Sequence, residues 1–159
     1  DYDDATGNYL FSMYRCECIA SINRESGATN WVLGGGEELL GTGLTLLDFD
    51  EPFGPQHAPR WVDGGVLMFD NGYDAGTSRL LQFDIAGDVA HRSWTYDQPG
   101  GYVTAVLGGV DVQADGGHLS SWGTLGEIVS TGPDDEIRWR VDIDPGHVLG
   151  QVSGFDSFE

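Results

Sequence analysis

The sequence predicts an all-β fold built from short antiparallel strands. Apolar residues make up 40% of the chain and recur in short runs separated by many of its 25 glycines. Short apolar runs that end in Gly, Asn or Asp are typical of strands joined by tight turns. With 159 residues, the chain is long enough to bury a core as one domain. The sequence contains no uninterrupted run of 18 apolar residues, which is the pattern of a membrane-spanning helix.

A weak internal repeat divides these strands into three groups. Each group ends with a turn followed by a Trp-centred strand, which contains Trp31, Trp94 or Trp139. The second interval, 45 residues, is the size of a four-stranded propeller blade, and the first, 63 residues, fits a blade plus an insertion. We therefore expect β-propeller blades, about three four-stranded antiparallel sheets, with the Trp rings packed between them.

The apolar and alternating patterns also place the individual strands. The expected strands are 9–14, 18–22 and 30–33 in the first blade, 58–62, 66–70, 80–84 and 91–96 in the second, and 103–113, 118–122, 127–130 and 137–141 in the third. The blades then cover approximately residues 1–33, 56–96 and 103–143 of one partial propeller domain, 1–159. Residues 34–55 are expected to be an insertion loop and residues 144–159 a C-terminal tail.

The chain is strongly acidic, with a net charge of −19 and a pI of about 4.1, and its seven basic residues are all Arg. A field of this sign repels nucleic acid and anionic lipid, so neither is expected as a partner. We interpret the charge as a solvated acidic surface. Calcium binding at LDFDEP or DNGYDAG is the alternative, although neither segment matches an EF-hand loop. No metal site or cofactor is expected.

Two cysteines, Cys16 and Cys18, are separated by one residue. On a straight strand their Cα atoms would lie about 6.6 Å apart, near the upper limit for a disulfide. The expectation is therefore two free, half-buried thiols. A lone Cys-x-Cys also offers too few ligands for a structural zinc site.

Chemistry-bearing residues cluster at predicted strand ends between residues 53 and 79. His57 follows a Gly-Pro turn, Asp70 and Asn71 follow the apolar strand VLMF, and Arg79 begins the next apolar run. Sites in repeated β architectures are usually built at such strand ends.

The segments QHAPRW, GGVLMFDNG and SRLLQFDI, in this order, resemble the core signature of the bacterial arylsulfate sulfotransferases. The segments DATGNYLFSMYRCECIASINRESGATNWVLGGG and GGVDVQADGGHLSSWGTLGE are similar to an earlier and a later part of that family. The resemblance covers most of the chain and implies the C-terminal half of a six-bladed propeller. It also implies a periplasmic or extracellular, PAPS-independent enzyme that transfers a sulfuryl group from an aryl sulfate to a phenol.

The resemblance also implies roles for single residues. His57 would be the nucleophile that forms a covalent sulfo-histidine, and Arg15 would contact the sulfuryl oxygens. Arg79 would bind an anion or pair with Asp70, and Asn71 would contact substrate, orient His57 or turn the chain. The family's further His and Asn, 16 to 18 residues before the Arg, would fall upstream of this sequence, so the remaining half of the propeller or another chain would complete the ring. His91, His118 and His147 match no motif position.

Two other functions stay open. The chain could be a non-catalytic propeller module for binding or assembly, because three open blades would expose sheet edges and faces. It could also be a quinoprotein-like propeller, since INRESGATNW resembles the blade repeat of pyrroloquinoline-quinone dehydrogenases. Those enzymes carry adjacent cysteines, whereas Cys16 and Cys18 are not adjacent.

Overall fold

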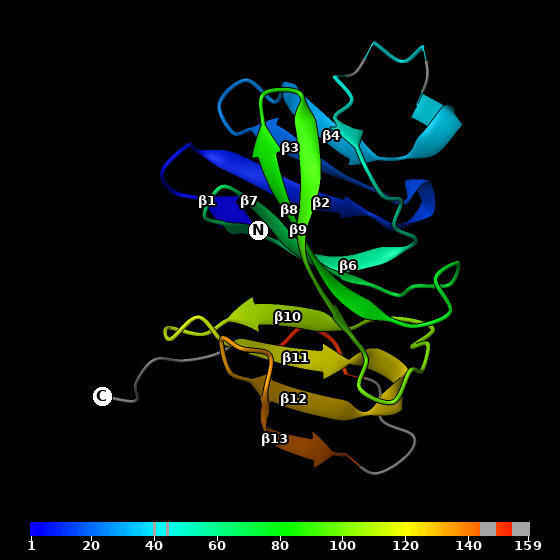
Figure 1. The fold of residues 1–159 in the computed structure, drawn as a ribbon. Coiled ribbons are helices and arrows are strands. Elements are labelled where there is room, and N and C mark those ends of the chain that lie inside the picture. Colours follow the sequence, from blue (N-terminus) through cyan, green and yellow to red (C-terminus); the bar gives the residue numbers. More distant parts are fainter. Residues whose placement is uncertain (40, 44, 144–148, 154–159) are drawn as a thin grey trace.

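The computed structural model describes residues 1–39, 41–43, 45–143 and 149–153, and it folds into three antiparallel sheets that follow one another along the chain (Figure 1). The first sheet has four strands in chain order: β1 (Tyr2–Asp3), β2 (Asn8–Met13), β3 (Cys18–Asn23) and β4 (Thr29–Gly34). Asn23 and Gly27 form the tight turn between β3 and β4, because Gly27 N donates to Asn23 O and Gly27 has φ +68°. This sheet is the first blade.

The second sheet is the central blade. Its meander consists of β6 (Gln56–Val62), β7 (Gly65–Asp70), β8 (Arg79–Ala86) and β9 (Val89–Asp97). A short fifth strand, β5 (Asp48–Phe49), pairs in parallel with β9 at the outer edge. The segment expected to be an insertion loop therefore contributes a strand, and it also contains the 3₁₀ turn η2 (Gly36–Leu39).

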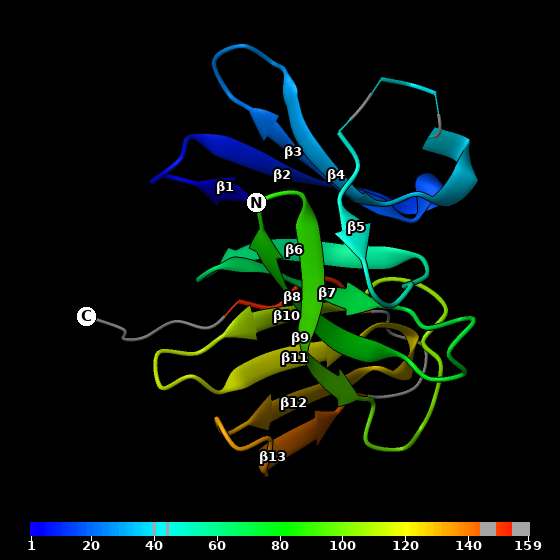
Figure 2. The same cartoon turned by 45° about the horizontal axis from the view of Figure 1, so that its top comes forward.

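The third sheet contains β10 (Gly109–Val112), β11 (His118–Trp122), β12 (Glu127–Thr131) and β13 (Ile137–Asp142), again paired in chain order. The two views show the three sheets stacked in chain order, with the central blade between the other two (Figures 1 and 2). Consecutive four-stranded meanders packed face to face are the blades of a propeller, so the expected all-β class is confirmed. Within the described ranges, no helix is long and apolar enough to cross a membrane.

The core consists of two layers, one on each side of the central blade. Val66 and Met68 of β7 pack with Leu10, Ile19 and Leu33 of the first blade. Leu67 and Phe69, which alternate with Val66 and Met68 along β7, point to the other face. There they form the second layer with Val110, Trp122 and Val129 of the third blade. Successive side chains of a strand point to opposite faces, so β7 is apolar at nearly every position because both of its faces are covered.

The three repeated tryptophans do not share one environment. Trp31 packs against the first core layer and Trp94 against the second, as expected for rings between blades. Trp139 is 47% exposed instead. It lies on β13, which is the last strand of the outermost sheet. Its side chain shares a face with Ser130, which is turned away from the central blade, so no blade in the described ranges covers it.

Most expected strands are present, but the segment 103–113 is a strand only at Gly109–Val112. Residues 103–108 are irregular, and Leu107 and Gly108 have φ of +61° and +112°. A β-strand requires negative φ at each position. Apolar content alone made this loop look like a strand.

The first and third blades share a local feature after their second strand. β2 runs into the 3₁₀ turn η1 (Tyr14–Cys16), and β11 runs into the 3₁₀ turn η3 (Gly123–Leu125). Each turn ends at a residue with left-handed backbone angles, whose N–H donates a hydrogen bond of 3.2 Å to the carbonyl oxygen of the first residue of the turn. These residues are Glu17 with φ +50° and Gly126 with φ +68°.

The expectation of free thiols is wrong, because Cys16 and Cys18 form a disulfide. The estimate for a straight strand does not apply here. Cys16 belongs to the η1 turn and Glu17 is left-handed, so the two Cα atoms lie 5.3 Å apart, well within the range of a disulfide. The disulfide therefore fixes the turn between β2 and β3.

Candidate active site around His57

His57 lies near the start of β6, where adjacent strand ends meet. The antiparallel register places Gln56 opposite Asp70 and His57 opposite Phe69. The chain before the strand is held by a hydrogen bond of 2.9 Å from Asn71 N to Pro55 O. As expected from the sequence, the histidine and the Asp-Asn pair therefore lie next to each other.

Asn71 fixes the hydrogen-bonding state of His57. The amide of Asn71 is fully buried, and its Nδ2 donates to Thr104 O over 2.8 Å and to Leu107 O over 3.1 Å. Because both partners are carbonyl oxygens, the amide can have only one orientation, with Oδ1 as the acceptor. Oδ1 lies 2.7 Å from His57 Nδ1, so Nδ1 carries the proton. In the neutral ring, Nε2 then keeps its lone pair.

A second layer of hydrogen bonds holds Asn71 itself. Ser78 is fully buried, and its Oγ donates to Asn71 O over 2.8 Å while accepting from Thr104 N over 2.7 Å. The Ser78 backbone also accepts from Gln98 N over 2.8 Å and donates to Tyr102 O over 3.0 Å. The loop after β7 is therefore fixed to the segment that leads to the third blade, and His57 is positioned by a rigid frame.

Asp70 and Arg79 form an ion pair next to this frame. Arg79 Nε donates to Asp70 Oδ2 over 2.8 Å, and the Asp70 side chain is fully buried. Asp70 Oδ1 accepts from Gly54 N over 3.2 Å and from Gly72 N over 2.9 Å. These contacts match the structural alternative for Arg79, since its guanidinium joins Asp70 at the strand end to Pro52 O, to which its Nη2 donates over 3.1 Å. They also occupy the Asp70 oxygens that the calcium alternative would need.

The η1 turn of the first blade places an aromatic side chain against His57. The Tyr14 ring lies 5.5 Å from the His57 ring, centroid to centroid. Arg15 is the next residue. It is exposed and makes no hydrogen bond or ion pair with the described residues. Arg15 follows the second strand of its blade, whereas His57 lies on the first strand of its own.

Gln56 joins the first blade to this site. Its side chain is fully buried, and Nε2 donates to Cys18 O over 2.5 Å. In return, Ser12 Oγ donates to Gln56 O over 3.0 Å. The residue before His57 is thus bonded to Cys18, the half-cystine that begins β3 just after the η1 turn, and this contact holds the turn and the histidine in register.

Two tyrosines complete the surroundings of His57. The Tyr73 hydroxyl donates to Ala105 O, and desolvation, together with a hydrogen bond between the Tyr73 and Tyr14 side chains, raises the pKa of Tyr73. No sequence pattern singled out Tyr14 or Tyr73. Tyr14 stands directly before the expected Arg15, and Tyr73 lies two residues after Asn71, so only their proximity to named residues could have found them.

The other histidines are not part of this arrangement. His91 is exposed beside Asp50, with 3.6 Å between His91 Nδ1 and Asp50 Oδ2. His118 stacks on Trp94, with centroids 4.3 Å apart. His147 lies outside the described residues. In the part of the chain that the structure describes, no three His, Cys, Asp or Glu side chains converge as a metal site would require.

The arrangement can support nucleophilic chemistry. It has a half-buried imidazole whose lone-pair position is defined, an unpaired guanidinium on the neighbouring turn, and phenol rings beside them. Transfer of an anionic group requires a positioned nucleophile and a cationic donor; the first is present here, and no contact between the Arg15 guanidinium and His57 is found among the described residues.

Comparison with known proteins gives little beyond the fold. No family model matches the chain, and no curated protein matches it. One similar solved structure is the crystal structure of BamB from Moraxella catarrhalis, with 14% sequence identity and a TM-score of 0.49. The match covers 89% of this chain and 36% of that chain, so this chain spans about a third of that protein. The sheet topology described above, rather than this likeness, establishes blades of propeller type.

Proposed function

We propose that this chain carries the nucleophilic histidine of a sulfuryl-transfer site of the arylsulfotransferase type. The observation that best supports the proposal is the buried Asn71 amide, which holds the proton on His57 Nδ1 and leaves Nε2 as the nucleophile. Neutral imidazole with a fixed tautomer is suited to covalent catalysis, in which one difficult transfer becomes two easier ones.

The chemistry follows from that geometry. The lone pair of His57 Nε2 attacks the sulfur of an aryl sulfate, the bond from sulfur to the aryl oxygen breaks, and the phenolate leaves and takes a proton from solvent. In the second step, the oxygen of an acceptor phenol attacks the same sulfur and gives its proton to solvent. The nitrogen–sulfur bond breaks and its electron pair returns to Nε2. Asn71 Oδ1 accepts from Nδ1–H throughout and stabilises the positive ring.

Arg15 is the cation that we assign to the sulfuryl oxygens. Its planar guanidinium suits an anion with three equivalent oxygens, and it lies on the turn that holds Tyr14 against His57. A local cation matters in a chain of net charge −19, whose overall field opposes the approach of an anion. Arg79 and Asn71 act as positioning residues in this proposal, because their side chains are engaged with Asp70 and with His57, Thr104 and Leu107.

The remaining blades of a ring would supply further groups, so a full site requires the rest of the propeller or a second chain. Aryl sulfate and phenol as partners, and a periplasmic or extracellular location, belong to the same proposal.

The test uses 4-nitrophenyl sulfate as donor and phenol as acceptor, with release of nitrophenolate measured by absorbance. In the completed propeller, we expect turnover with the wild-type sequence and none with His57→Asn, because Asn offers no comparable nucleophile. His91→Asn is the matched control, since His91 is exposed and remote from Asn71. Mass spectrometry of protein incubated with donor alone should find SO₃ on the peptide that contains His57. Full activity of His57→Asn would refute the proposal.

A second function, assembly with another propeller-like sheet, is supported by two open faces. Tyr9, Phe11 and Met13 alternate along β2 and are 38–48% exposed. On β13, Trp139 and Val141 are each 47% exposed. Apolar rows of this kind on the outer blades are suited to packing against another blade.

This assembly is tested by light scattering. We expect the wild-type chain to associate and the variant Phe11→Ser with Trp139→Ser to shift toward monomer. The control is Tyr102→Ser, which removes an even more exposed ring, 62% exposed, that lies outside both strands; this variant should associate like the wild type. A monodisperse wild-type monomer would contradict the proposed assembly.

A further inference from the structure

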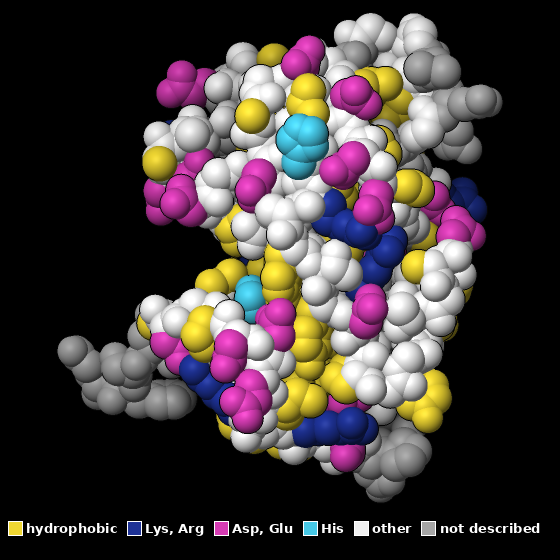
Figure 3. All heavy atoms as spheres, viewed as in Figure 1, with side chains coloured by type: hydrophobic (Ala, Val, Ile, Leu, Met, Phe, Trp, Pro, Cys, Tyr) yellow, Lys and Arg dark blue, Asp and Glu magenta, His cyan; other side chains and the backbone are white. Residues whose placement is uncertain are grey.

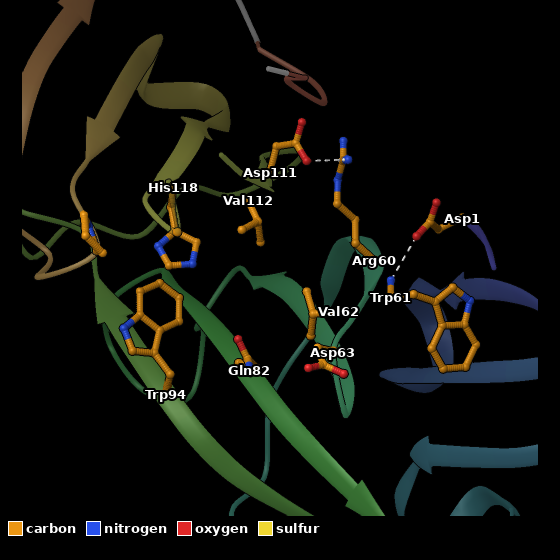
Figure 4. A pocket seen from close by; sticks show the side chains of 12 residues that line it. Asp1, Arg60, Trp61, Val62, Asp63, Gln82, Trp94, Asp111, Val112 and His118 are labelled. Atoms are coloured by element: carbon orange, nitrogen blue, oxygen red, sulfur yellow. Dashed lines mark hydrogen bonds and ion pairs between the residues drawn. The ribbon is translucent and has the colours of Figure 1, made fainter. Parts of the chain in front are cut away.

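The two contacts between neighbouring blades follow one pattern, in which a Trp on the last strand of a meander meets a ring on the next blade. Trp31 of β4 contacts Trp61 of β6, with ring centroids 5.6 Å apart. Trp94 of β9 stacks on His118 of β11 with centroids 4.3 Å apart, and Figure 4 shows this pair side by side. The central blade thus receives a Trp on its first meander strand, and the third blade receives one on its second strand.

Trp139 repeats the offering side of this pattern on the outermost sheet. It lies on β13, the last strand of the third blade, and is turned away from the central blade. Ile137 and Val141 alternate with intervening residues on the same side of the strand, so the three side chains form one apolar row, named here the β13 row. These side chains are 44–47% exposed, and no further blade in the described ranges receives them.

The receiving side of the pattern is open at the other end of the stack. Leu10 of β2 points to the central blade, so the residues next to it along the strand point away from that blade. They form an apolar row, named here the β2 row, of Tyr9, Phe11 and Met13. The row is 38–48% exposed. Because β2 is the second strand of its blade, as β11 is of the third, the β2 row can receive a Trp as His118 does.

Other parts of the two outer faces are covered by the chain itself. On the first blade, Leu39 and Leu46 pack against the outward side of β3 and β4. On the third blade, Ser121 Oγ donates to Gly150 O, so the segment around Gly150 lies against β11. The β2 row and the β13 row remain open beside these covers.

We propose that a second copy of this chain occupies both rows, with the β13 row of each copy packed on the β2 row of the other. The relation between neighbouring blades within the chain is then repeated twice more, and six blades close into one ring. Propellers have roughly 4–8 blades, so six is an ordinary number. The inference rests on the assembly proposed above and names its partner and arrangement. It does not depend on sulfuryl transfer.

The contacts within the chain favour this arrangement over a pairing of like rows. In both ring contacts, the Trp of a last strand meets an early strand of the next blade. A twofold pair of copies arranged head to tail reproduces that contact at two identical interfaces and uses all four rows. Pairing two β13 rows would leave both β2 rows exposed to water.

The charge of the chain sets the conditions for this pairing. Each copy has a net charge of −19, and Figure 3 shows Asp and Glu side chains scattered over the face in view. Two such copies repel each other, and salt screens this repulsion without weakening the apolar contact. The dissociation constant of the pair should therefore fall as the salt concentration is raised.

Sedimentation equilibrium of the 159-residue chain over a range of concentrations tests the ring. The mass should rise from 17.2 kDa and stop at twice this value, because a closed ring has no free row. A mass that keeps growing with concentration, as in an open-ended stack of copies, would overturn the ring. A monomer at every concentration, at low and at high salt, would defeat the proposed assembly and the ring together.

Two single variants and their mixture identify the contact. Phe11→Ser damages the β2 row and Trp139→Ser damages the β13 row. Each variant alone should be monomeric, because every interface of its ring would contain one damaged row. An equal mixture should pair again through the one interface whose two rows are intact. With one interface in place of two, the dissociation constant of the mixed pair should exceed that of the wild type by about 10²-fold or more.

The control Tyr102→Ser changes neither row and should pair like the wild type. Pairing of like rows would give a different result, because one of the two single variants would then pair like the wild type. That outcome, or a mixture that stays monomeric, would overturn the head-to-tail arrangement while the proposed assembly still holds. The limit of the wild-type mass at two copies is measured without any variant.

Discussion

Replacement of Asn71 by Ala is the most direct test of the frame around His57. The substitution removes three hydrogen bonds at once: those to Thr104 O, to Leu107 O and from His57 Nδ1. Thr104 O lies in a buried bond, so it loses its partner without access to water, whereas the other two groups are partly buried. A buried unsatisfied group costs about 1–3 kcal/mol and a more accessible bond contributes about 0.5–1.5 kcal/mol. Together they predict a loss of roughly 2–6 kcal/mol in the free energy of unfolding.

Urea denaturation followed by tryptophan fluorescence measures this loss. Asn71→Asp is the informative companion, because it keeps an acceptor for His57 but places carboxylate oxygens against the carbonyls of Thr104 and Leu107. It should therefore destabilise at least as much as Asn71→Ala. In the wild type, ¹⁵N spectra of the neutral His57 ring should show the proton on Nδ1. A loss below about 1 kcal/mol for Asn71→Ala, or a neutral ring protonated on Nε2, would refute the reasoning.

Three further outcomes are expected. Arg15→Lys should lower the rate of sulfuryl transfer about 10²-fold, because a point charge replaces the planar donor. Arg24→Lys is the control and should keep the wild-type rate. An unchanged rate in Arg15→Lys would exclude Arg15 from the site. Reduction of the Cys16–Cys18 disulfide should lower the free energy of unfolding by roughly 1–2 kcal/mol, a small effect because the loop that it closes is short. Urea denaturation with and without reductant measures the difference. Two free thiols in untreated protein would contradict the prediction. Burial raises the pKa of Glu127 above its usual 4.5, against the opposing effect of Arg140, so the folded state binds more protons and stability is lost as pH rises through the folded pKa. The free energy of unfolding of Glu127→Gln should therefore rise relative to that of the wild type as the pH is raised above about 4.5. A difference between the two proteins that does not change with pH would argue against this.

Strand positions were readable from the sequence because each apolar run is bounded by turn residues. β7 is the clearest case, since its run from Val66 to Phe69 is apolar at every position and both of its faces are buried. The neighbourhood of His57 and Asn71 was also expected, because adjacent strand ends in a meander must meet.

Details that depend on long-range contacts could not be read in this way. The orientation of the Asn71 amide depends on carbonyls more than 30 residues away, and no local pattern encodes it. The disulfide was missed because its two cysteines were placed on a straight strand, whereas Glu17 is left-handed. A cavity near Arg60 likewise takes its lining from five strands, so its residues are scattered along the sequence.

The 3₁₀ turns that follow β2 and β11 have a practical consequence for protein engineering. Both turns close on a left-handed residue, yet their first residues differ, because η1 begins with Tyr14 and η3 with Gly123, whose φ is +26°. A Cβ at Gly123 would lie 2.3 Å from Val106 O, so the Tyr14 side chain cannot be moved to that position. The exchange is open in the other direction: replacing Tyr14 and Arg15 by the Gly-Thr of the third blade removes a phenol and a guanidinium together and leaves Cys16 and its disulfide in place. One variant can therefore remove both side chains from the turn beside His57 without a change to any strand.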